Sequence, residues 1–84
     1  MKKRQKRNAD IYEIIAANIK HLRKEAKLTQ AELAERSGFS HEYIRRIEAP
    51  NGEKYFSIDS LVKIADGLET DIAELLKGIS NGGK

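Results

Sequence analysis

The stretch from Thr29 to Glu48 constrains the fold most strongly, because it encodes two short helices joined by a tight turn. The Thr29 hydroxyl can accept a hydrogen bond from the first turn of a helix, and Glu32 can reach back to the Thr29 backbone. Gly38 can adopt the left-handed conformation with which a helix commonly ends. Ser40 can then cap a second helix. The spacing therefore predicts one helix after Thr29 and another after Ser40.

The apolar positions of these two helices define an inner face. Leu33 and Ala34 form the apolar side of the first helix, and Ile44 and Ile47, three residues apart, form that of the second. The opposite face of the second helix is polar and carries His41, Glu42, Tyr43, Arg45 and Arg46. Taken alone, such a face is either plain solvated surface or a surface that reads the edges of DNA base pairs.

Three further helices are predicted by apolar residues at spacings of three and four. One runs from Asp10 to about Lys27, one is capped by Ser57, and one is capped by either Thr70 or Asp71. No segment alternates apolar and polar residues as a half-buried strand would. The predicted fold class is therefore all-α, with five short helices in one small domain.

We expect the 84-residue chain to form a single domain over residues 9–78, followed by a flexible tail over residues 79–84. Residues 1–8 contain no apolar side chain after Met1, so we expect this segment to be disordered. It is either a solvated tail or a basic arm that follows DNA phosphates or enters a minor groove.

Positive charge is concentrated in that N-terminal segment. The formal net charge is +3, from 16 basic and 13 acidic residues. Five of the basic residues are Lys2, Lys3, Arg4, Lys6 and Arg7. Removing these five leaves 11 basic against 13 acidic residues in the rest of the chain. Any binding of nucleic acid by the domain must therefore come from the placement of particular residues, with the N-terminal segment adding attraction.

Several classes of protein are disfavoured by composition. The chain has no cysteine, which excludes disulfides and cysteine metal sites and fits a reducing compartment. No apolar run approaches the roughly 20 residues of a membrane span, and the N-terminus lacks the apolar segment of a signal peptide. The two histidines have no convincing nucleophile, carboxylate or metal-ligand spacing nearby. We expect a cytoplasmic protein that is not an enzyme and needs no metal or cofactor.

Residues Ile11 to Leu76 resemble the phage repressor/Cro-type helix-turn-helix domain, often called the XRE family. The resemblance is carried by T-Q-A-E-L-A from Thr29, by Gly38, Ile44, Ile47 and Glu48, and by the downstream S-I-D-S-L-V-K-I-A-D-G-L and D-I-A-E-L-L. It implies a compact five-helix lambda-repressor-like domain. It also implies binding to a palindromic DNA operator, usually as a homodimer, with the second helix of the motif in the major groove.

The resemblance also implies roles for individual residues. The candidates for reading bases are Ser40, His41, Glu42, Arg45 and Arg46. The candidates for contacting the DNA backbone are Thr29, Gln30, Tyr43, Lys54 and the five basic residues of the N-terminal segment. Within these sets, Arg46 suits a bidentate contact with guanine, and Glu42 either accepts from the amino group of cytosine or repels a wrong base. We expect Arg45 and Tyr43 to touch the DNA backbone or each other.

A third group of residues is implied to be structural. In the family a basic residue late in the first helix pairs with the acid that ends the recognition helix, which predicts an ion pair between Arg23 and Glu48. The candidates for a dimer surface are Ile72, Leu76 and Ile79. Tyr55 and Phe56 are the rival candidates, and that pair can instead anchor its loop on the core.

The chain departs from the common family pattern in two places. The loop after Glu48 is about two residues longer and carries Glu53, and His41 replaces the usual Gln or Asn beside the cap. The class of regulator stays open among a phage-type repressor, a restriction–modification controller and a stand-alone regulator. The alternative to a regulator is an antitoxin-like or adaptor module, in which the same fold mainly binds a protein.

Overall fold

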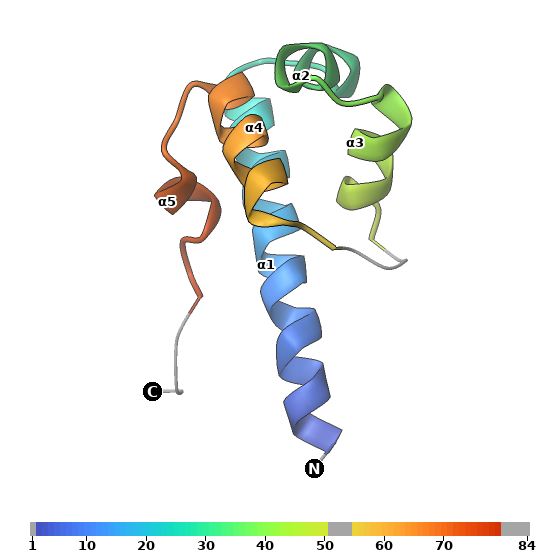
Figure 1. The fold of residues 1–84 in the computed structure, drawn as a ribbon, viewed down its shortest axis with the longest axis vertical. Helices are drawn as coiled ribbons and strands as arrows, with labels where there is room; N and C mark the ends of the chain where they lie inside the picture. Colours follow the sequence, from blue (N-terminus) through green and yellow to red (C-terminus); the bar gives the residue numbers. More distant parts are fainter. Residues whose placement is uncertain (1, 51–54, 80–84) are drawn as a thin grey trace.

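The computed structural model describes the backbone of residues 2–50 and 55–79, and the side chains of residues 11–50 and 55–79. These ranges form helices and connecting loops, with no strand within them. Figure 1 shows the five helices: α1 (Lys2–Glu25), α2 (Gln30–Ser37), α3 (His41–Glu48), α4 (Ile58–Leu68) and α5 (Ile72–Leu75). The all-α fold class and the order of the predicted helices are confirmed.

Helix α1 begins at Lys2, well before the predicted start at Asp10. The segment that we expected to be disordered is thus the first part of this helix, and in Figure 1 it extends beyond the other helices. The physical reason is that residues 2–10 contain no Gly or Pro, while Lys, Arg, Gln and Ala are good helix formers. Adding a residue to an existing helix is also much easier than starting a new one.

The predicted caps of the helix-turn-helix stretch are present. The Glu32 N–H donates to Thr29 Oγ1 at 3.0 Å, and the Thr29 N–H donates to Glu32 Oε1 at 2.8 Å. The Tyr43 N–H donates to Ser40 Oγ at 3.1 Å. Gly38 has a φ of 82° and no atom within 4 Å of where a Cβ would lie. Glycine is needed there for its conformation and not for space.

The last two helices begin at the predicted caps. Ser57 caps α4 by accepting a hydrogen bond from the Ser60 N–H at 3.0 Å. Asp71 holds the N-cap position of α5, although its side chain makes no capping hydrogen bond. Gly67 lies inside α4, where an added Cβ would come within 3.2 Å of Ser37 Cβ on α2. This glycine therefore permits the close approach of α2 and α4.

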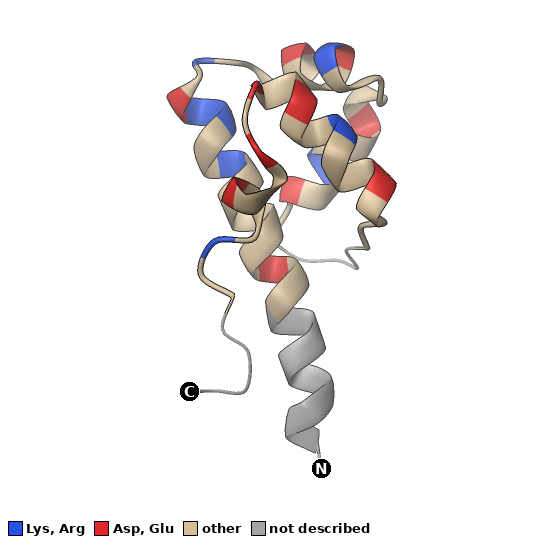
Figure 2. Cartoon of the chain, turned by 60° about the vertical axis from the view of Figure 1, so that its left-hand side comes forward, with Lys and Arg blue, Asp and Glu red and all other residues tan. Residues whose placement is uncertain are grey.

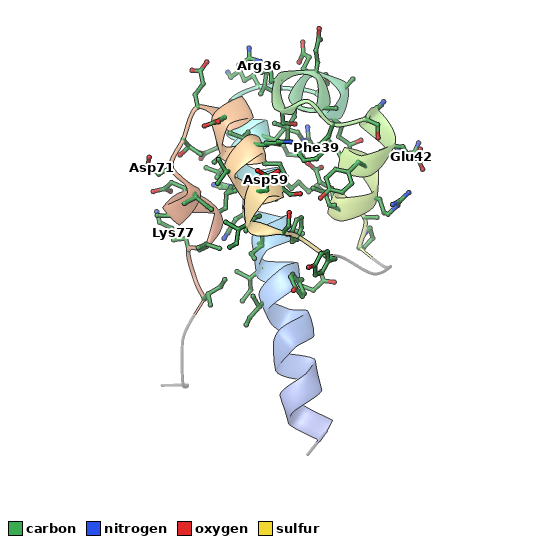
Figure 3. The ribbon with its side chains drawn as sticks, in the orientation of Figure 1. Arg36, Phe39, Glu42, Asp59, Asp71 and Lys77 are labelled. Carbon is green, nitrogen blue, oxygen red and sulfur yellow. The ribbon has the colours of Figure 1, made fainter. Side chains whose placement is uncertain are left out.

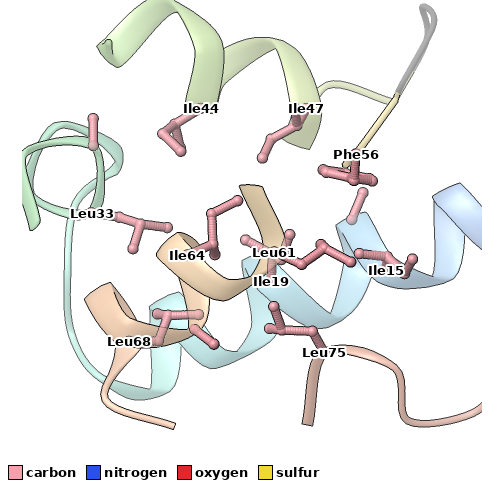
Figure 4. Close-up of a cluster of buried hydrophobic side chains, with 13 residues drawn as sticks. Ile15, Ile19, Leu33, Ile44, Ile47, Phe56, Leu61, Ile64, Leu68 and Leu75 are labelled. Atoms are coloured by element: carbon pink, nitrogen blue, oxygen red, sulfur yellow. The ribbon is translucent and has the colours of Figure 1, made fainter. Parts of the chain in front are cut away.

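One cluster of buried side chains holds the helices together, as Figure 4 shows. Each helix contributes one fully buried side chain: Ile19, Leu33, Ile44, Ile64 and Leu75. The short helix α5 is also held by a polar contact, because Asn18 Nδ2 on α1 donates to the carbonyls of Leu75 and Lys77, at 2.8 Å each. Within the described ranges, no helix combines the length and apolar character needed to cross a membrane.

Candidate nucleic-acid interface

Helix α3 separates a buried face from a polar exposed face. Ile44 and Ile47 point into the core, whereas His41 and Glu42 are exposed. Arg45 and Arg46 are exposed as well. In Figure 3 the Glu42 side chain points away from the rest of the domain, so the outer face of α3 is open to a ligand.

The turn between α2 and α3 fixes the direction in which α3 leaves. The N–H groups of Gly38 and Phe39 both donate to the Ala34 carbonyl at 2.9 Å. These bonds satisfy a carbonyl that the end of α2 would otherwise leave without a partner. The chain then enters α3 at Ser40. The turn therefore holds the two helices in a defined relative orientation.

The predicted ion pair between Arg23 and Glu48 is present and buried. Arg23 Nε lies 2.7 Å from Glu48 Oε2, and Arg23 Nη2 lies 2.8 Å from Glu48 Oε1. Arg23 Nη1 donates to the Leu28 carbonyl at 2.8 Å. A bidentate pair of this kind restricts both distance and angle. It therefore links the end of α1 to the end of α3 and sets how α3 is presented.

Gln30 joins this ion pair, which sequence reasoning missed. Its side-chain Nε2 donates to Glu48 Oε1 at 3.0 Å. The Glu48 carboxylate therefore accepts hydrogen bonds from Arg23 Nε, Arg23 Nη2 and Gln30 Nε2. The side-chain amide of Gln30 is thus engaged within the protein. The second N–H of this amide and the backbone N–H of Gln30, at the first position of α2, remain as donors for the predicted phosphate contact.

The outer face of α3 contains one internal ion pair. Arg45 Nη2 lies 3.4 Å from Glu42 Oε1, three residues away on the same helix. The Arg46 guanidinium has no ion pair or hydrogen bond to the side chains that the structure describes. Arg46 is therefore the cation of α3 that is free to bind an acceptor.

The ring of Tyr43 packs against the ring of Phe39. The two ring centroids are 4.6 Å apart, with an angle of 31° between the planes. Lys63 Nζ lies 5.9 Å from the centre of the Phe39 ring, which connects these aromatics to α4. The expected contact of Tyr43 with the DNA backbone or with Arg45 stays a prediction.

The family assignment follows from comparison with known proteins. The sequence of residues 19–75 matches the helix-turn-helix family HTH_3. This chain belongs to that helix-turn-helix family. It is 35% identical over 74 residues to the control protein C.SmaI of Serratia marcescens, covering 86% of each chain. It is 33% identical over 67 residues to the HTH-type transcriptional regulator y4dJ of Sinorhizobium fredii, covering 80% of this chain and 84% of the other. No solved structure matches it.

Membership of this family assigns the chain to DNA-binding transcription regulators, with α2 and α3 as the helix-turn-helix. Of the predicted DNA contacts, Thr29 and Ser40 are exposed at the starts of α2 and α3. Lys54 lies outside the described residues. The five basic residues Lys2, Lys3, Arg4, Lys6 and Arg7 lie on α1, and the structure describes only their backbone.

The predicted dimer candidates of this helix-turn-helix domain differ in exposure. Phe56 is 6% exposed and belongs to the core, so it anchors the loop and is unavailable as a dimer contact. Tyr55 is 71% exposed. Ile72 and Ile79 are half-buried and pack against the core, and Leu76 is 38% exposed. Of the two neighbouring aromatic residues, Phe56 is thus buried in the core and Tyr55 lies on the surface.

Proposed function

We propose that this chain is a sequence-specific transcription regulator that binds a palindromic DNA operator as a homodimer. The α3 helix of each copy would enter the major groove of one half-site. The observation that carries the proposal is the division of α3, in which Ile44, Ile47 and Glu48 are buried while the polar side chains are exposed. The names of the two relatives, a control protein and a transcriptional regulator, support a role in gene control.

Arg46 is the main base-reading residue in this proposal. Its guanidinium is exposed and carries no described partner, so it can donate two parallel hydrogen bonds to guanine O6 and N7. Arg45 and Glu42 partly neutralise each other at 3.4 Å. They therefore act as a pair, with Glu42 accepting from cytosine or excluding a wrong base. His41 and Ser40 stand at the N-terminal end of α3, which in helix-turn-helix proteins lies nearest the bases.

The DNA backbone is held by two other features. The N-terminus of α2 presents free N–H groups beside Thr29, and such a terminus favours a phosphate. The basic start of α1 supplies long-range attraction, because the rest of the chain has 11 basic and 13 acidic residues. As a helix about 10 Å wide, this segment is too broad for a minor groove about 6 Å wide. It would therefore follow phosphates rather than enter that groove.

Selection of bound duplexes from a random DNA library tests the proposal. The expected result is a palindrome whose half-sites are separated by about one helical turn, 10–10.5 base pairs. Footprinting of the selected duplex should show protection of two successive major grooves on one side of the DNA. A selection that enriches no motif, or a single half-site without symmetry, would overturn the homodimeric operator.

A further inference from the structure

An exposed apolar strip runs along the start of α4. Among the described residues, the exposed large apolar side chains are Tyr55 (71%), Ile58 (72%), Val62 (43%) and Leu76 (38%). Ile58 and Val62 are one turn apart and share one face of α4, while Tyr55 lies just before Ser57, the N-cap of this helix. We call these three residues the α4 strip. An apolar strip of this kind on a regulator is a candidate contact with a partner.

The charged side chains beside the α4 strip alternate in sign. Lys63 Nζ lies 3.4 Å from Asp59 Oδ2, one turn away, and both side chains are more than half exposed. Asp66 follows one turn further along. Figure 2 shows the resulting order along α4: an acid, a base and a second acid. In an antiparallel pair of α4 helices, Asp59 of each copy can therefore face Lys63 of the other.

We propose that the α4 strip is the surface through which two copies of this chain dimerise, with their α4 helices antiparallel across a two-fold axis. This inference rests on the proposed homodimer and names its surface. A two-fold axis that crosses α4 near residues 60 and 61 brings Ile58 of one copy close to Val62 of the other. The same axis places Asp59 of one copy beside Lys63 of the other. Because the axis is two-fold, the apolar contact and the charged contact each form twice in the dimer.

The same axis accounts for the exposed aromatic residue at the end of the strip. Tyr55 precedes the N-cap of α4, and at 71% exposure its ring can cover the edge of the contact between the two copies. Tyr55 is already positioned by a ring contact with Tyr12 on α1, at 6.0 Å between centroids. Its ring therefore loses little freedom on binding, which favours association.

The alternative surface on α5 is not self-complementary. Among its described large apolar side chains, Leu76 is the exposed one, at 38%. The surface beside it carries Glu69, Asp71 and Glu74, of which Glu69 pairs with Arg36 at 3.7 Å and Glu74 with Lys77 at 3.2 Å. Two copies meeting there would bring acids against acids, which opposes association. The charges therefore favour α4 over α5 as the interface between copies.

The α4 surface is also compatible with simultaneous DNA binding. In Figure 3, Asp59 lies over the front of α4, whereas Glu42 on α3 points to the side. The two surfaces thus face in different directions. A two-fold axis that runs along the direction of the α3 outer face leaves both α3 helices exposed on one side of the dimer.

Charge reversal at Asp59 and Lys63 gives a test that a structural role alone cannot imitate. Asp59→Lys places four cations at the interface of its own dimer, and Lys63→Asp places four anions there. Each variant alone should have a dimer dissociation constant at least tenfold higher than that of the wild type, measured by sedimentation equilibrium. An equimolar mixture of the two variants should form a heterodimer with affinity near that of the wild-type dimer, because each acid then faces a base.

Two further variants separate the surfaces. Ile58→Glu removes the centre of the strip while keeping an acid in the first turn of α4, where the helix dipole favours it. It should weaken the dimer at least tenfold with an unchanged circular dichroism spectrum. Leu76→Lys on α5 should leave the dimer constant within twofold.

The inference is overturned if the mixed variants form no heterodimer, or if Leu76→Lys dissociates a dimer that Ile58→Glu leaves intact. A wild-type chain that is monomeric at all concentrations and still selects a DNA palindrome overturns both the surface and the free homodimer, while the DNA-binding function stands. A dimer that dissociates as described but selects no DNA motif supports the surface and contradicts the proposed operator.

Discussion

Replacement of Arg23 by alanine tests the role of the buried ion pair in presenting α3. Arg23→Ala removes the donors at 2.7 and 2.8 Å from Glu48 and the donor to the Leu28 carbonyl. The Glu48 carboxylate stays buried, with the Gln30 amide at 3.0 Å as its remaining described donor. Removing one partner of a buried pair costs about 3–5 kcal/mol. An 84-residue domain has a total stability of roughly 4–13 kcal/mol, at about 0.05–0.15 kcal/mol per residue.

The expected result is therefore the loss of a large fraction of the free energy of unfolding, measured by urea denaturation followed by circular dichroism. Lys24→Ala is the matched control, since Lys24 is the exposed neighbour on α1 and its loss should cost less than about 0.5 kcal/mol. The double variant Arg23→Met with Glu48→Leu should recover most of the lost stability, because no buried charge is then left without a partner. If Arg23→Ala costs no more than Lys24→Ala, the ion pair does not hold α3.

Three other outcomes are expected from the backbone and the charge distribution. Gly38→Ala should lower the free energy of unfolding by about 1 kcal/mol in a urea titration, because φ is 82° there. Lys27→Gly, at a φ of 62°, should raise it by a smaller amount. If both substitutions change the free energy of unfolding in the same direction, this reasoning is refuted. Gly67→Ala should destabilise despite the better helix propensity of alanine, since its Cβ would lie 3.2 Å from Ser37 Cβ, and a more stable variant would show that α2 and α4 can separate at no cost. Changing the five basic residues within 2–7 to glutamine should weaken binding to all DNA sequences alike and flatten its dependence on salt; a loss confined to the selected site would contradict a phosphate role.

The helix pair could be predicted from sequence because its signals are local. The capping box of Thr29 with Glu32 involves residues three apart, and the left-handed Gly38 needs no distant partner. The start of α1 could not be placed in the same way. Nothing in residues 2–10 stops a helix, so the hydrophobic pattern from Ile11 marks where packing begins and not where the helix begins.

The parts of the site that depend on distant contacts were harder to predict. The pairing of Arg23 with Glu48 came from the family resemblance, and the hydrogen bond from Gln30 to Glu48 spans 18 residues with no local signature. The contact between Tyr43 and Phe39 depends on how the turn places the two rings. By contrast, the pair of Arg45 with Glu42 has the ordinary spacing of helical ion pairs, which would have predicted it.

The most direct test of the central claim, that the outer face of α3 reads DNA bases, is the affinity of Arg46→Ala for the duplex selected by the wild-type chain. Arg36→Ala is the matched control, because Arg36 lies on α2 and pairs with Glu69 at 3.7 Å. We predict that Arg46→Ala binds more weakly by about 1–3 kcal/mol and loses its preference at one base pair in each half-site, while Arg36→Ala keeps both affinity and preference. An Arg46→Ala variant with unchanged base preference at every position would contradict the claim.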